Sequence, residues 1–405
     1  MAERLRNDTK LTPESMKDSL LLDFIHTLPR HPKHALVFVI DALDECGDDQ
    51  SRRVLLKVLT DAAAQAPWLK IIITSRPEVD IQRFFDAPAR SSHLRHDLAA
   101  DDKAADDLRI FAQDRFGRLA SKRHLQSPWP EPSLLDGVIS RAAVLFIFIK
   151  TIALALEQCK DPTETLKRIL QDSDGTGLIS PYGLYSSILK TRIVHSCPEF
   201  RRVIGVVLAT APYRPLCEET IAELAEIDLS HVKTWMDDLS SLLYRDEKAN
   251  GAVRVRHLSI SDFFVSDDCP CNYQVNLHDA NVQLGNACLD TMTGQLRFNI
   301  CRLEDSRLAN ANIKDLPSRI KENISDPLHY SSRYWSNHLC STPHNGNPRV
   351  WGRLKEFFEG LYPLFWIEVL SIMGMVPIGA PSLRRVISWI RVRTNPAKPL
   401  VCIPR

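Results

Sequence analysis

The sequence predicts an α/β unit with a small parallel sheet near the amino terminus, followed by a mainly helical region. Two apolar runs carry the first part of this prediction, ALVFVIDALDE at Ala35–Glu45 and KIIITSRPE at Lys70–Glu78. Between them, residues 51–66 place apolar side chains at helical spacing. A strand, a helix and a second strand within so short a stretch form a βαβ unit. We therefore expect the two strands to be parallel and buried on both faces.

Length, charge and composition bound the class of protein. A chain of 405 residues is expected to form about two to four domains. The net charge of +1 creates no overall field that favours nucleic acid or anionic membrane. The first 18 residues are too polar for a signal peptide, and ten scattered cysteines fit free thiols in a reducing compartment. We therefore expect a cytoplasmic protein.

Two apolar stretches and one group of cysteines raise alternatives. Ala142–Leu156 is interrupted by Lys150, and Leu361–Ala380 contains Glu368, so buried helices are favoured over membrane contact. A zinc site is a further alternative, but its candidate ligands lack the C-x₂-C spacing of a zinc knuckle. These candidates are Cys269, Cys271, His278 and Cys288. We favour ordinary cysteines.

Acidic residues follow the first predicted strand, and an arginine follows the second. They are Asp41, Asp44, Glu45 and Arg76. Ligands of parallel sheets bind beyond the carboxyl ends of the strands. A carboxylate there can hold Mg²⁺, further acids can orient a water, and an arginine can reach a terminal phosphate. The pattern indicates nucleotide-phosphate handling. The alternative is a buried strand that ends in a solvated acidic turn.

These two stretches resemble motifs of a known family. VFVIDALDEC is similar to the Walker B motif of NACHT-type proteins, the STAND class of P-loop NTPases, and IIITSRPE resembles their sensor 1 strand. The combination of DALDEC followed by TSRPE is similar to fungal NACHT proteins that usually carry WD repeats at the carboxyl end. The resemblance implies ATP or ADP with Mg²⁺ as ligands. It also implies that Asp41 is the metal ligand, that Asp44 and Glu45 are catalytic acids that position water, and that Arg76 is the phosphate sensor.

The printed sequence contains no G-x-x-x-x-G-K-[ST] motif, and its first glycine is Gly47. In the family, this Walker A motif precedes Walker B, and its amides and lysine hold the phosphates. The WD repeat signature is also absent from the sequence. We therefore expect a truncated relative in which nucleotide binding is weak or lost, and the prediction leans against enzymatic activity. A fragment, a gene-model truncation and a degenerate paralogue remain open.

The predicted elements up to residue 177 follow the chain in order. Residues 1–100 are expected to be a partial NACHT core, and residues 101–175 a helical subdomain. The expected elements are a helix over 13–28, a short helix at Val79–Phe85, a strand at His93–Leu98, and helices at Ala100–Phe116, Ser133–Leu156 and Glu164–Gln171. Residues 172–177, DSDGTG, are expected to be a linker.

Residues 182–270 are predicted to form a winged helix. Three helices are expected at 199–210, 218–227 and 229–243, followed by a hairpin at Tyr244–Ile260 that turns at Asn250-Gly251. A DNA-reading helix would need a basic surface. The third helix instead balances His231 and Lys233 against two aspartates. DNA binding is therefore the weakest of the functions considered.

The sequence RHLSISDFF at Arg256–Phe264 resembles a strand motif of NACHT winged helices. The resemblance implies that His257 contacts the bound diphosphate and locks the resting state. The alternative is a satisfied histidine at the end of the wing. Residues 271–405 are expected to be helical and resemble the connector that precedes the WD repeats. A free-standing helical array fits their periodicity equally well.

Together these observations predict an α/β + α chain: a partial P-loop NTPase sheet, a helical subdomain, a winged helix and a carboxyl-terminal helical region. The predicted function is a NACHT-derived signalling switch that depends on ATP or ADP in the parent family. The alternative is a non-enzymatic scaffold that binds full-length NACHT relatives. The expected partners are proteins, through self-association or paralogues, rather than nucleic acid or membrane.

Overall fold

The computed structural model describes residues 35–46, 49–66, 68–86, 93–96, 98, 103–142, 145–171, 181–193, 198–305, 307–341 and 348–394. The chain divides into two compact units, Met1–Asp97 and Leu98–Arg405. The described residues are mostly helical and include a small two-stranded parallel sheet, which agrees with the predicted α/β + α class.

The first unit contains the predicted βαβ arrangement. Its elements are β1 (Leu36–Ile40), the 3₁₀ turn η2 (Leu43–Glu45), α4 (Asp49–Gln65), β2 (Leu69–Ile73) and α5 (Val79–Phe85). The strands are parallel, and their register runs from Leu36 opposite Leu69 to Ile40 opposite Ile73. The predictions of a parallel pair and of a short helix at Val79–Phe85 are confirmed.

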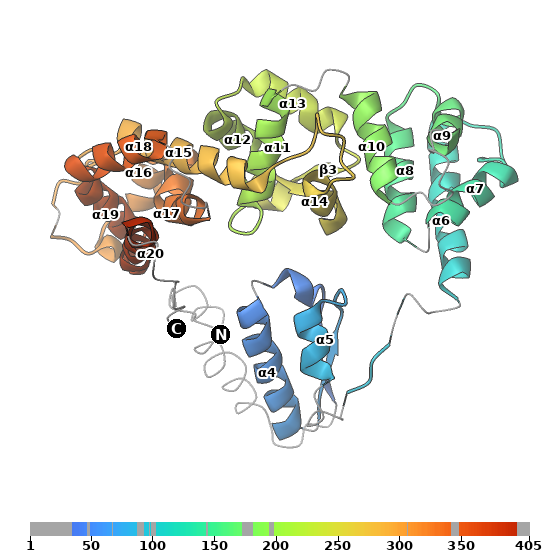
Figure 1. The fold of residues 1–405 in the computed structure, drawn as a ribbon, viewed down its shortest axis with the longest axis horizontal. Coiled ribbons are helices and arrows are strands. Elements are labelled where there is room, and N and C mark those ends of the chain that lie inside the picture. The colour runs from blue at the N-terminus through green and yellow to red at the C-terminus, as the bar shows by residue number, and fades with distance from the viewer. Residues whose placement is uncertain are drawn as a thin grey trace. The chain divides into compact units, whose positions relative to one another are not determined.

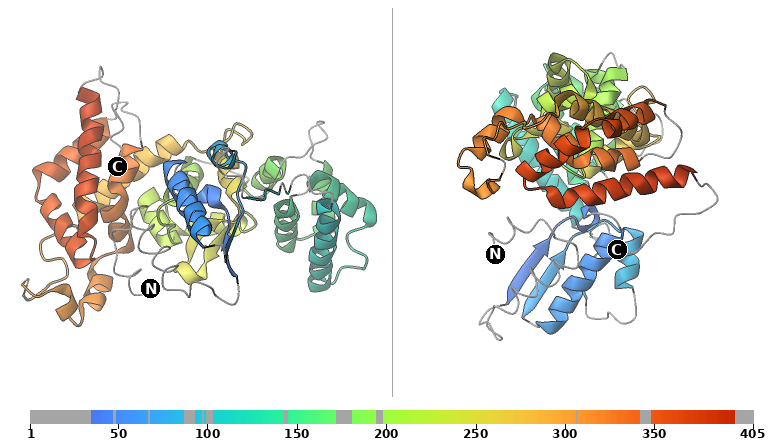
Figure 2. Two further views of the ribbon diagram at one scale, coloured as in Figure 1. Left: turned by 90° about the horizontal axis from the view of Figure 1, so that it is seen from below. Right: turned by 90° about the vertical axis from the view of Figure 1, so that its left-hand side faces the viewer.

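Helices α4 and α5 cover the same face of the sheet, as the right-hand view of Figure 2 shows. Leu36, Phe38 and Ile40 on β1 pack toward these helices. On the opposite face, Val37, Val39 and Ile72 are 49%, 67% and 52% exposed. The prediction that the strands are buried on both faces is therefore wrong for the described residues, because both helices lie on one side.

Two further predictions concern the edges of the first unit. Residues 93–96 have no regular secondary structure, so the predicted strand at His93–Leu98 is wrong for the residues described. These four residues are exposed, and the fully exposed Leu94 has no apolar contact to hold a strand against the sheet. The helix predicted over 13–28 and the linker at 172–177 lie outside the described residues.

The second unit begins with four helices: α6 (Ala104–Arg123), α7 (Pro132–Ala142), α8 (Phe146–Glu157) and α9 (Pro162–Gln171). The single helix predicted at Ser133–Leu156 is therefore two. Leu145 has an extended backbone (φ −92°, ψ 106°), which interrupts helical hydrogen bonding between α7 and α8. Helix α8 buries Phe148, Ile149 and Ile152 in the core. No helix in the described ranges is long and apolar enough to cross a membrane.

The middle of the second unit combines helices with an antiparallel hairpin (Figure 1). Its elements are α10 (Pro181–Arg192), α11 (Pro198–Thr210), α12 (Glu218–Ala225), α13 (Leu229–Asp238), β3 (Leu243–Asp246), the 3₁₀ turn η4 (Glu247–Ala249), β4 (Ala252–Val255) and α14 (Leu258–Val265). Asn250 and Gly251 both have positive φ, at 55° and 71°, but they end a longer connection than the predicted Asn-Gly turn, because Asp246 pairs with Ala252 and η4 lies between them. The hairpin ends at Val255, earlier than predicted, because α14 begins at Leu258.

The carboxyl-terminal part is helical, as predicted. It contains α15 (Leu277–Gln295), η5 (Asn310–Asn312), α16 (Leu316–Asn323), α17 (Asp326–Cys340), α18 (Pro348–Glu359), α19 (Tyr362–Ile372) and α20 (Val376–Thr394). Helices α15 and α17 pack closely, and Leu339 backbone atoms lie within 3.4 Å of the position of a Cβ on Gly285. Aromatic residues of α17, α18 and α19 fill the core beside them, including Trp335, Phe357 and Trp366.

Candidate functional site

The acidic segment after β1 makes a sharp turn. Ala42 has a left-handed backbone conformation, φ 54° and ψ 54°, and buried Leu43 anchors the turn in the core. The Ala42 amide donates to the Thr74 hydroxyl at 3.0 Å, and the Leu43 amide donates to the Thr74 carbonyl at 3.0 Å. The turn leaves Asp41 and Glu45 exposed. Asp44, in contrast, has a side chain that is only 6% exposed.

Polar contacts join the carboxyl ends of the two strands. The Thr74 hydroxyl donates to the Asp41 carboxylate in a short hydrogen bond. The Thr74 amide donates to the Ile40 carbonyl at 2.9 Å. The exposed Asp41 carboxylate therefore lies beside a hydroxyl oxygen, and oxygen donors of this kind suit Mg²⁺.

Asp44 connects the acidic turn to the arginine that follows β2. Its Oδ1 accepts from the Arg76 amide at 3.0 Å and from the Ser75 hydroxyl at 3.3 Å. Its Oδ2 lies 3.6 Å from Nε of Arg76, whose side chain is 35% exposed. The structure thus brings Asp41, Asp44, Glu45 and Arg76 together at one end of the sheet.

A buried ion pair that was not predicted from the sequence lies beside this turn. Arg52 on α4 is 8% exposed, and its Nε donates to Asp80 of α5 at 2.9 Å. Its other nitrogens contact Asp49 at 2.5 Å and the Asp44 carbonyl at 3.4 Å. The hydrogen bond between Arg52 and Asp80 raises the pKa of Arg52 and lowers the pKa of Asp80. The available signal was periodicity, because Arg52 lies four residues before Leu56 on the buried side of α4.

Replacing Arg52 with methionine is expected to destabilise the packing of α4 on α5 by about 3 kcal/mol, because the buried Asp80 carboxylate loses its partner. Hydrogen exchange of peptides from residues 49–86 measures this directly. The matched control is Arg53→Met, which removes an exposed arginine one position along the same helix. Equal exchange in the two variants would contradict the assignment.

His257 lies in the second unit, where it caps a helix. The prediction that its motif is a strand is wrong, since β4 ends at Val255 and His257 precedes α14. Its Nδ1 accepts from the Ser259 amide at 3.2 Å and lies 2.7 Å from the Ser259 hydroxyl, which lies 2.9 Å from the Tyr185 hydroxyl. In the neutral ring the proton therefore lies on Nε2. The H-x-S spacing thus places the histidine cap and its partner amide at the helix start.

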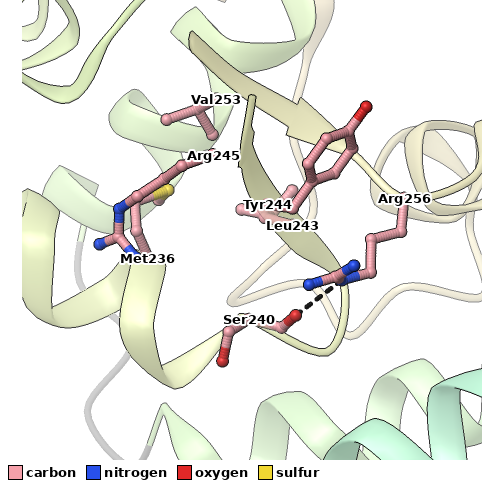
Figure 3. A pocket seen from close by; sticks show the side chains of 7 residues that line it. All are labelled: Met236, Ser240, Leu243, Tyr244, Arg245, Val253 and Arg256. Atoms are coloured by element: carbon pink, nitrogen blue, oxygen red, sulfur yellow. Dashed lines mark hydrogen bonds between the residues drawn. The ribbon is translucent and has the colours of Figure 1, made fainter. Parts of the chain in front are cut away.

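A small cavity lies between the end of α13 and the hairpin (Figure 3). Arg256 donates from Nε to the Ser240 carbonyl at 2.7 Å and lies over the Tyr244 ring, while Arg245 pairs with Glu218 and Asp237. The other lining residues are Met236, Leu243 and Val253. The cavity volume of about 170 Å³ is below the ~300–1,000 Å³ of drug-sized ligand sites, so it does not fit a whole nucleotide.

Comparison with known proteins shows what the two units are similar to. The family described as "Nephrocystin 3, N-terminal" matches residues 1–76, which include Asp41, Asp44, Glu45 and Arg76. A similarity to one curated protein also extends over most of the second unit. The chain is 25% identical over 385 residues to vegetative incompatibility protein HET-E-1 of Podospora anserina.

That alignment covers 87% of this chain but 26% of the relative, so the chain spans about a quarter of the relative's length. The two matches confirm the resemblance to a fungal NACHT protein that the motifs indicated. They support a NACHT-related role, and they assign no function to individual residues.

Proposed function

We propose that residues 35–76 form the Walker B and sensor 1 part of a nucleotide-phosphate site in a NACHT-derived signalling switch. One observation carries this proposal. An exposed carboxylate, Asp41, and a half-exposed guanidinium, Arg76, lie at the same end of a parallel strand pair and are joined through Thr74 and Asp44. Ligands of parallel sheets bind at this end.

The residues can be given roles toward ATP or ADP. Asp41, with the neighbouring Thr74 hydroxyl, would hold Mg²⁺, and the ion would neutralise phosphate oxygens. Proteins commonly hold Mg²⁺ with one or two carboxylates plus substrate phosphates, and the exposed Asp41 can supply one such carboxylate. Glu45 would orient a water, Arg76 would contact a terminal phosphate, and His257 would contact the diphosphate.

The proposed domain assignment follows the predicted boundaries. Residues 1–100 would be the partial nucleotide-binding core, and 101–175 the helical subdomain. Residues 182–270 would be a winged helix, supported by α11 to α13 followed by the β3–β4 hairpin. Residues 271–405 would be the helical connector. A cytoplasmic location is proposed with them, supported by the free thiols of the cysteines in the described ranges.

The 405-residue chain is proposed to bind nucleotide weakly. The sequence has no G-x-x-x-x-G-K-[ST] motif, and charge-assisted phosphate contacts contribute roughly 1.5–3 kcal/mol each. Two missing contacts of this kind would turn a micromolar site into a roughly millimolar one. We therefore expect little or no nucleotide turnover by this chain.

Titration of the purified chain with a fluorescent ADP analogue in Mg²⁺ tests the proposal. We expect a dissociation constant of about 1 mM, weakened at least tenfold in Asp41→Ala because that variant loses the metal carboxylate. The control is Asp61→Ala, which removes a carboxylate from the second half of α4, away from the carboxyl ends of the strands. His257→Ala tests the second contact. Absence of binding up to about 10 mM would exclude a nucleotide role for this chain.

A non-enzymatic scaffold is the second candidate, and the exposed face of β1 and β2 favours it. Val37, Val39 and Ile72 form an apolar surface in a unit whose other face is covered. The partners would be further copies of the chain or longer NACHT relatives. Light scattering of the wild type and of a Val39→Lys variant tests this candidate, which predicts an assembly only in the wild type.

A further inference from the structure

We infer that Asp44 is a positioning residue that fixes the guanidinium of Arg76, and that it does not orient the attacking water. The role of Arg76 toward phosphate rests on the proposed function, whereas the contacts between Asp44 and Arg76 are observed in the structure. This role for Asp44 changes the division of roles among the three acids, leaving Asp41 for the metal and Glu45 for water.

The Asp44 carboxylate has little access to solvent. The Asp44 side chain is 6% exposed, whereas Asp41 and Glu45 are both exposed. An acid that orients a water must reach that water by a hydrogen bond. Of the three acids, Asp44 is therefore the least able to contact a solvent molecule at the end of the sheet.

Both Asp44 oxygens already face protein donors. Oδ1 accepts from the Arg76 amide at 3.0 Å and from the Ser75 hydroxyl at 3.3 Å. Oδ2 lies 3.6 Å from Arg76 Nε. All three donors come from the segment after β2, so the carboxylate holds that segment and the arginine side chain together.

The backbone of Asp44 is itself held by Arg52 of α4. Arg52 Nη1 donates to its carbonyl at 3.4 Å, and Arg52 is fixed by Asp80 at 2.9 Å. The Asp44 side chain faces the β2 end while its carbonyl faces α4. This support from two directions is what a positioning residue requires, because it lowers the freedom of Arg76 before any phosphate is bound.

Arginine-specific labelling without nucleotide tests the inference. Phenylglyoxal modification of the intact chain is followed by mass spectrometry, and the rate at Arg76 is divided by the rate at exposed Arg83 of α5. Asp44→Asn is expected to raise this ratio by up to about fivefold, because the interaction in a partly exposed ion pair corresponds to at most about that factor. Glu45→Gln, which removes the exposed neighbouring acid, is expected to leave it unchanged.

Two results would overturn the inference: an unchanged ratio in Asp44→Asn, or an equal rise in Glu45→Gln. Hydrogen exchange of residues 36–40 checks that the variant keeps its sheet. If Asp44→Asn loses the sheet, Asp44→Glu retains the charge with a longer side chain. A rise of about twofold is then expected, because the carboxylate no longer matches the Ser75 and Arg76 donors. No rise would overturn the inference.

A nucleotide experiment separates this inference from the proposed function. Asp44→Asn is expected to reduce the preference for an ATP analogue over an ADP analogue about threefold, because Arg76 would contact the terminal phosphate less well. Loss of binding in Asp41→Ala with no effect of Asp44→Asn on either labelling or preference would overturn the Asp44 role alone. Absence of all nucleotide binding would overturn the proposed function, and the labelling result would still decide the position of Arg76.

Discussion

Replacing Trp335 with alanine is expected to lower the free energy of unfolding of the carboxyl-terminal helices by about 4 kcal/mol. The Trp335 side chain is completely buried. Its ring packs against Phe357 and Trp366 with centroid distances of 5.5 and 5.8 Å, and against Phe358 at 6.4 Å. Alanine leaves a cavity where helices α17, α18 and α19 meet. Urea unfolding, followed by hydrogen exchange of peptides from 326–372, measures the loss.

Trp335→Phe and Trp366→Phe form a control pair, because both remove an indole and keep an aromatic ring. The indole Nε1 of Trp335 has no hydrogen-bond partner in the described part of the chain, whereas Nε1 of Trp366 donates to the Ser332 carbonyl at 2.8 Å. Trp366→Phe should therefore cost about 1 kcal/mol more than Trp335→Phe. Equal costs would show that the hydrogen bond contributes nothing, and a small effect of Trp335→Ala would contradict the packing.

Acid is expected to destabilise the same region through His338, which is buried on α17. Its Nδ1 lies 2.8 Å from Asn281 Oδ1, and its Nε2 lies 2.7 Å from the Tyr330 hydroxyl. The Asn281 amide nitrogen donates to the Leu277 carbonyl at 2.7 Å, so its oxygen faces the histidine. His338 is therefore neutral, with its proton on Nδ1, and Tyr330 donates to Nε2.

Burial lowers the pKa of His338 from its ordinary 6.5 to about 4. The unfolded chain then binds a proton more readily than the folded chain, so stability is complete above pH 6.5 and falls between 6.5 and about 4. The loss is about 2 kcal/mol at pH 5 and about 3 kcal/mol below pH 4. Urea unfolding at pH 7.5 and 5 measures this fall.

His338→Gln is the control, because glutamine does not titrate. Burial also lowers the pKa of His329, next to Arg214, so both proteins should lose some stability in acid. The difference in unfolding free energy between wild type and His338→Gln should nevertheless shrink by about 2 kcal/mol from pH 7.5 to 5. Parallel pH dependence in the two proteins would contradict the assignment of His338.

Sequence periodicity was sufficient where a segment's structure depends on its own residues. The apolar runs at 36–40 and 69–73 gave two parallel strands, and Asn250-Gly251 supplied the positive φ values of the hairpin turn. Periodicity was not sufficient where a side chain that caps a helix competes with the hydrogen bonding of a β-strand. His257 follows an alternating strand pattern, but its ring accepts the Ser259 amide and begins a helix instead. The alternation of apolar and polar side chains does not predict this local hydrogen bond between a side chain and the backbone.

The candidate site divides in the same way. The acids after one strand and the arginine after the next are visible in the sequence, and they are expected to meet because parallel strands carry their carboxyl ends to one edge. Which acid faces solvent and which is held by Arg76 depends instead on tertiary packing, since it follows from how the turn at Ala42 packs against Thr74. The buried Arg52–Asp80 pair likewise required the packing of α4 on α5, since the two residues are 28 positions apart in the chain.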